Sequence, residues 1–135
     1  MTIYSGPLDC PANSTKEYEV EVEGDIITRV RLHFPPGPQG LLHVRFFQGI
    51  KQIFPQPEEA YFSGDDEIIE WDEYYELAEH KSTIRVVLEN KDDTYEHQVI
   101  VTLVVQDRQK EVSERIASAI AKKIMSIFRM LTGWV

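Results

Sequence analysis

Acidic side chains form the densest group of residues in this chain that could do chemistry. The run consists of Asp65, Asp66, Glu67, Glu70, Asp72, Glu73, Glu76 and Glu79. Oxygen ligands in acidic turns suit Ca²⁺, so a cation site is one interpretation. However, Gly64-Asp65-Asp66-Glu67 departs from the calcium-loop pattern, and no spacing selects two carboxylates for glycoside hydrolysis. The sequence therefore favours a solvated acidic face.

Two of the four histidines, His33 and His43, flank a proline-rich loop at residues 35–40. If the strands on either side formed a hairpin, the two imidazoles could lie opposite each other. Zn²⁺ takes three or four ligands, and no third ligand accompanies this pair by spacing. In the alternation of their expected strands, both histidines fall on the same outward face as nearby arginines. This position predicts a solvated or interface surface. We therefore expect no metal ion and no cofactor.

Aromatic residues offer a third kind of site, a platform on which a sugar could stack. They are Tyr61, Phe62, Trp71, Tyr74 and Tyr75. Aromatic side chains on strands more often pack in a core or between subunits, and we expect that here. The chain has no Ser-His-Asp order, nucleophile elbow, Gly-rich phosphate loop or Cys-x-x-Cys pair. We therefore expect no enzymatic activity.

Strands must position these residues, because apolar and polar side chains alternate over most of the chain. Short alternating segments are separated by turn signals at the spacing typical of an antiparallel sandwich or jelly roll. The expected strands span residues 16–22, 26–34, 42–46, 50–54, 67–77, 82–89 and 95–105. Residues 1–15 contain two prolines, a glycine and small polar residues, and are expected to be an arm or loop. The prediction is a jelly-roll-like β-sandwich over residues 1–107.

The period changes to three and four from Arg108 onward, which predicts one amphipathic helix over residues 108–135. Its apolar stripe includes Ile116, Ile120, Ile124, Ile127, Leu131 and Trp134. The charge changes at the same place: residues 1–107 carry 8 Lys/Arg and 21 Asp/Glu, net −13, whereas residues 108–135 carry 6 and 2, net +4. An isolated helix of this length is marginal in water, so the stripe must bury against something. We expect it to form a protein interface.

Three kinds of surface could cover the apolar stripe. They are the chain's own sandwich, copies of itself or another protein, and an anionic membrane surface. Intermolecular packing is favoured, which makes the chain a homo-oligomer or part of a larger shell. The acidic sandwich predicts no nucleic-acid binding. The N-terminus lacks a basic start and an apolar run, and no segment has the roughly 20 apolar residues of a membrane span. The single Cys10 is typical of a reducing compartment, so the expected location is cytoplasmic unless the chain is a particle component.

Several segments also resemble a group of known proteins. They are Phe34-Pro-Pro-Gly-Pro-Gln-Gly-Leu-Leu-His-Val-Arg-Phe-Phe, Gln52-Ile-Phe-Pro, Gly64-Asp-Asp-Glu-Ile-Ile-Glu-Trp and Asn90-Lys-Asp-Asp-Thr-Tyr-Glu-His. Over about residues 10–105 the chain resembles small uncharacterised β-sandwich structural proteins of tailed phages and prophages. The resemblance implies a virion or phage-assembly component without enzymatic activity, and it supplies no site residues. The alternative function is a ligand-binding sandwich, either a carbohydrate binder or a cation-dependent adhesive module.

Overall fold

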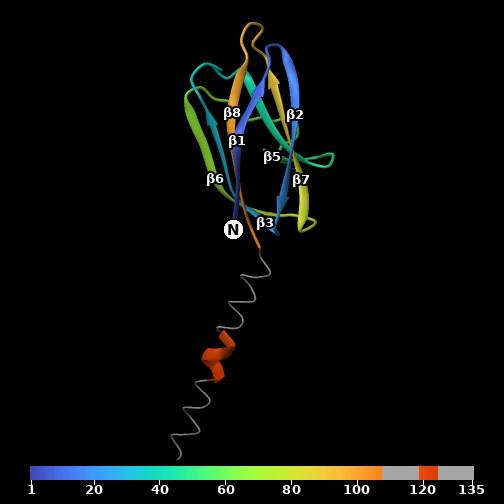
Figure 1. The fold of residues 1–135 in the computed structure, drawn as a ribbon, viewed down its shortest axis with the longest axis vertical. Coiled ribbons are helices and arrows are strands. Elements are labelled where there is room, and N and C mark those ends of the chain that lie inside the picture. The colour runs from blue at the N-terminus through green and yellow to red at the C-terminus, as the bar shows by residue number, and fades with distance from the viewer. Residues whose placement is uncertain (108–118, 125–135) are drawn as a thin grey trace, which may run out of the picture.

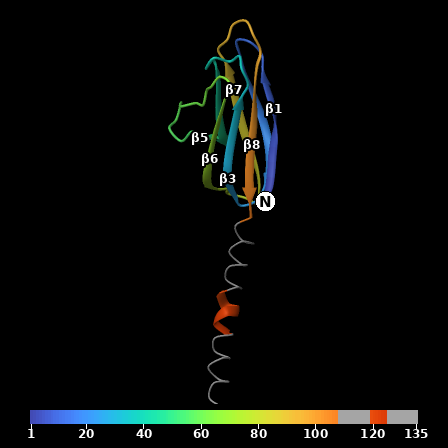
Figure 2. The ribbon, with the colours of Figure 1, turned by 90° about the vertical axis from the view of Figure 1, so that its left-hand side faces the viewer.

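The computed structural model describes residues 1–107 and 119–124. Residues 1–107 form two four-stranded antiparallel sheets packed face to face (Figure 1). The strands are β1 (Thr2–Cys10), β2 (Ser14–Glu23), β3 (Ile26–Phe34), β4 (Leu42–Gln48), β5 (Lys51–Phe54), β6 (Glu67–Glu76), β7 (Lys81–Asn90) and β8 (His97–Gln106). One sheet has the order β1-β8-β3-β6, visible side by side in Figure 2, and the other has the order β2-β7-β4-β5. The predicted β-sandwich is confirmed.

Strand pairing follows the jelly-roll pattern. The first strand pairs with the last, with Thr2 opposite Val105, and β2 pairs with β7, β3 with β6 and β4 with β5. Two further pairings, β3 with β8 and β4 with β7, join these hairpin-like pairs into the two sheets. The chain thus resembles one long hairpin wrapped around a core, which is the double Greek key of a jelly roll.

The core lies between the two sheets and is formed by the inward-facing apolar residues of seven strands and by the end of β1. Alternation puts every second side chain inside, as the burial patterns of β4, β7 and β8 show. The largest fully buried side chains include Phe34, Phe46, Ile27, Leu32, Leu42, Ile53, Ile84, Leu88 and Leu103. Each such side chain contributes about 1.5–3 kcal/mol relative to full exposure. This core fixes the register of each strand and therefore the direction of each outward side chain.

A β-bulge in β3 changes the expected alternation. Strict alternation along residues 26–34 would place Thr28 on the inward face, but the register shifts between Ile27 and Arg29 in both pairings of this strand. As a result Ile26 and Ile27 are both buried, and the Thr28 hydroxyl donates to the Val104 carbonyl at 3.4 Å. A bulge adds one residue to a strand and so inverts the parity on one side of it. Two adjacent isoleucines can therefore both enter the core.

The expectation of an arm or loop over residues 1–15 is wrong for residues 14–15, which begin β2, and for residues 2–10. This segment is the edge strand β1, which pairs with β8 over its whole length. Pro7 lies within it opposite Ile100, because an edge strand tolerates a residue that cannot donate a backbone hydrogen bond. The proline and glycine that suggested a loop instead mark a sheet edge. Only the short turn around Asn13, whose φ is +50°, connects β1 to β2.

Candidate functional site

The C-terminal helix is described at residues 119–124. Within it Ile120 and Ile124 lie one turn apart on the same face, and they are 53% and 49% exposed. Lys122 lies on the other side of this turn. The remaining residues predicted for the stripe, Ile116, Ile127, Leu131 and Trp134, lie outside the described residues. The two described members of the stripe thus present about half of their apolar surface.

The acidic run does not converge on one point. Asp65 holds the proline-rich loop, because its Oδ1 accepts backbone hydrogen bonds from Gly37 at 2.8 Å and Gln39 at 3.1 Å. Glu70 and Asp72 instead form ion pairs with Arg29 on the outer face of β3. Within residues 1–107 and 119–124, the run supplies no group of three metal-ligating side chains. Asp65, Glu70 and Asp72 thus have structural partners on different elements.

The premise of a hairpin between His33 and His43 is wrong. His33 is on β3 and His43 is on β4, which belong to different sheets. The His43 ring stacks on Tyr61, with ring centroids 3.7 Å apart and an interplanar angle of 8°. Burial lowers the pKa of His43 and so favours the neutral imidazole. The two histidines therefore lie on different sheets and cannot form one site.

The five aromatic residues do not share one exposed face. Phe62, Trp71 and Tyr75 are partly buried and pack against the core, and the Phe62 and Trp71 ring centroids are 5.0 Å apart. Tyr61 and Tyr74 are exposed. Most of this aromatic surface contributes to packing between the sheets, as the sequence analysis expects.

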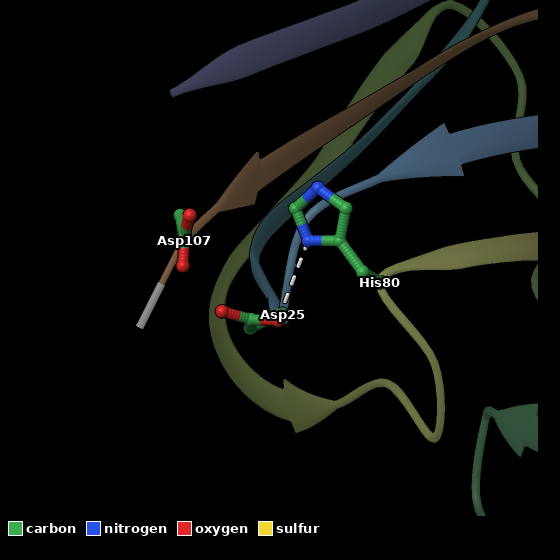
Figure 3. A group of neighbouring side chains, drawn as sticks. All are labelled: Asp25, His80 and Asp107. Atoms are coloured by element: carbon green, nitrogen blue, oxygen red, sulfur yellow. Dashed lines mark ion pairs between the residues drawn. The ribbon is translucent and has the colours of Figure 1, made fainter. Parts of the chain in front are cut away.

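A different group of side chains converges at the end of the sandwich where β8 finishes. Asp25 lies in the turn between β2 and β3, His80 in the turn between β6 and β7, and Asp107 directly after β8 (Figure 3). One ligand atom from each residue lies within 4.8 Å of the other two. His80 Nδ1 is 3.6 Å from Asp25 Oδ1. Two carboxylates and an imidazole form a ligand set for a divalent cation.

Backbone hydrogen bonds hold the three segments of this group together. The amide of Gly24 donates to the carbonyl of His80 at 2.8 Å, and the amide of Asp25 donates to the carbonyl of Gln106 at 2.9 Å. The carbonyl of Asp25 accepts from Leu77 at 2.8 Å. Each turn that carries a ligand is thus bonded, at or next to that ligand, to another segment. The arrangement is set by the sandwich and does not depend on side-chain contacts alone.

Sequence reasoning missed this group because its members are far apart along the chain. Glu23-Gly24-Asp25 reads as an ordinary turn, and His80 and Asp107 follow at distances that match no metal-binding spacing. Only the pairing of the strands brings the two turns and the end of β8 to one end of the molecule. The one available signal is that all three residues fall at or next to expected turns or strand ends.

Comparisons with known proteins give little further information. No protein family and no curated protein matches the chain. Two solved structures are similar in part. The Yersinia pseudotuberculosis-derived mitogen shares 8% identity with a TM-score of 0.45, over 78% of this chain and 87% of its own. FlhE shares 15% identity with a TM-score of 0.31, over 76% of this chain and 97% of its own. At these TM-scores neither likeness carries an argument about function.

In residues 1–107 and 119–124, no helix combines the length and the apolar character that crossing a bilayer requires.

Proposed function

We propose that this chain is a non-enzymatic assembly module whose C-terminal helix packs against copies of itself. The observation that carries the proposal is the apolar surface of Ile120 and Ile124, which are each about half exposed one turn apart. Burying a side chain of this size contributes about 1.5–3 kcal/mol before the cost of ordering. A surface helix with such a stripe is stabilised chiefly by what covers it.

Charge complementarity favours a second copy as the occupant. Residues 1–107 carry a net charge of −13 and residues 108–135 a net charge of +4, so the helix of one copy is attracted to the sandwich of another. Such attraction speeds the encounter and weakens as salt is added. The resemblance to phage structural proteins suggests a virion or phage-like particle as the assembly. The alternatives, a carbohydrate-binding or cation-dependent module and a peripheral membrane protein, predict a monomeric chain.

Sedimentation velocity of the full chain tests this proposal. Wild type should sediment as an oligomer, and the double variant Ile120→Asp/Ile124→Asp should sediment as a folded monomer. Loss of two buried isoleucines removes about 3 kcal/mol or more, which weakens association at least a hundredfold. Circular dichroism should show the same β-type spectrum for both proteins.

Lys122→Asp is the matched control, since it changes the net charge by the same two units on the other side of the same helix. At about 0.5 M salt, where surface charges are screened, this variant should still associate. A monomeric wild type, or a double variant that sediments like wild type, would refute self-association through the helix. Binding of a monomeric wild type to anionic vesicles would identify the membrane alternative.

A further inference from the structure

We propose that Asp25, His80 and Asp107 form a binding site for a divalent transition-metal ion of the Zn²⁺ class. The site is separate from the helix stripe and goes beyond the assembly function. It lies at the end of the sandwich where β8 finishes, and its three ligands come from three different segments (Figure 3). A bound ion would join these segments into one unit.

The spacing of the donor atoms is close to that of a metal site. Zn²⁺ binds nitrogen and oxygen ligands at about 2.0–2.2 Å, so two donors on a tetrahedral ion lie about 3.4 Å apart. His80 Nδ1 and Asp25 Oδ1 are 3.6 Å apart, and all three donor atoms lie within 4.8 Å of one another. The third donor is at most 4.8 Å from the other two, so this ligand must approach by up to about 1.4 Å, a shift that side-chain rotation can supply.

The imidazole of the site is more exposed to solvent than the carboxylates, so an ion can enter from the imidazole side. The side chain of Asp25 is 28% exposed and that of His80 is 58% exposed, and Asp107 has intermediate burial. The carboxylates are thus held by the fold while the imidazole can rotate to close on an ion. Because this group supplies three ligands, a tetrahedral ion keeps one position for water or for another group.

The chemistry of the ligand set favours Zn²⁺ over the alkaline-earth ions. Ca²⁺ and Mg²⁺ prefer oxygen ligands, whereas an imidazole nitrogen suits Zn²⁺ and its neighbours in the first transition series.

Titration of chelator-treated, tag-free full-length protein with Zn²⁺ tests the site by isothermal calorimetry. Wild type should bind one Zn²⁺ per chain, and Ca²⁺ and Mg²⁺ should bind far more weakly. His80→Gln and Asp107→Asn should each weaken Zn²⁺ binding at least tenfold, since even loss of a group that only supports a ligand costs tenfold or more. His33→Gln, which removes a histidine from the outer face of β3, is the control and should bind like wild type.

Amide NMR spectra locate the bound ion independently of affinity. Zn²⁺ should shift the amide signals around Asp25, His80 and Asp107 and leave those around His33 and His43 in place. The proposal is overturned if wild type binds no Zn²⁺, if His80→Gln binds it equally well, or if the shifts cluster at another histidine. Sedimentation without metal tests the helix separately, so failure of one proposal does not affect the other.

Discussion

His97 Nε2 lies 2.7 Å from Asp92 Oδ2 in the turn that leads into β8. Because an ionised carboxylate can only accept, the imidazole N–H is the donor in this contact. The other carboxylate oxygen of Asp92 accepts backbone hydrogen bonds from Thr94 at 2.9 Å and Tyr95 at 3.3 Å. The hydrogen bond from His97, followed by the one from Thr94, lowers the pKa of Asp92 below its ordinary value. One carboxylate thus organises the whole turn.

The turn should therefore lose stability in acid. A carboxyl group whose pKa is lower in the folded state stabilises the protein above its unfolded pKa, about 3.9, and loses that contribution as pH falls through the folded value. Asp92→Asn should lower the melting temperature at pH 7, and the gap to wild type should narrow below about pH 4. Asp93→Asn removes the same charge from the same turn and is the control. A gap that stays constant with pH would contradict this account.

Gly24 should be far less replaceable than Gly6. The φ of Gly24 is +143°, and a Cβ there would lie 2.5 Å from Val105 Cγ1 and 3.2 Å from the Gln106 carbonyl oxygen. Gly24→Ala should thus lower the free energy of unfolding by about 1–3 kcal/mol. A Cβ on Gly6 meets no atom within 4 Å, so Gly6→Ala should be neutral or slightly stabilising. Urea unfolding of both variants measures the difference, and equal effects would refute it.

Phe46 should be a major contributor to the core. It is fully buried on β4, and its ring contacts Phe54 and Phe62 edge-on, with centroids 5.8 and 6.4 Å away. Phe46→Ala should lower the free energy of unfolding by about 3–5 kcal/mol, because it leaves a cavity between the sheets. Ile50 is 99% exposed, so Ile50→Ala should change stability by less than about 0.5 kcal/mol. Similar losses for the two variants would mean that the core lies elsewhere.

Residues 1–107 should fold without the C-terminal helix. The buried cluster of the sandwich extends from Cys10 to Val105, and its strands complete both sheets. A fragment ending at Asp107 should therefore keep a β-type circular dichroism spectrum and a cooperative melting transition. Complete loss of folded structure on this truncation would show that the helix belongs to the core.

The sequence predicted those parts of the fold that depend on local alternation. The expected strands over residues 42–46 and 82–89 show their inward residues directly, and they correspond to β4 (Leu42–Gln48) and β7 (Lys81–Asn90). Residues 2–10 resemble a loop because glycine and proline are typical of loops, and a proline within a strand is tolerated chiefly at a sheet edge. The position of β1 at a sheet edge depends on its pairing with β8, almost a hundred residues away. The local sequence pattern of residues 2–10 does not contain that pairing.

The candidate sites divide in the same way. The helix stripe is periodic within one element, so Ile120 and Ile124 could be selected from spacing alone. Asp25, His80 and Asp107 come from separate turns, and only the jelly-roll pairing brings them together. His33 and His43 are not brought together, because β3 and β4, although consecutive along the chain, lie in different sheets.

The pairing of Thr2 with Val105 also has a consequence for synthesis of the chain on the ribosome. At about 5–20 residues per second, the first strand waits roughly 5–20 seconds before its partner is made. During that time its backbone donors and acceptors can pair with any other extended chain nearby. Pro7 shortens the stretch that can pair in this way, because it removes one donor from the middle of the strand. Pro7, which makes residues 2–10 resemble a loop, thus also limits incorrect strand pairing of the nascent protein with other chains.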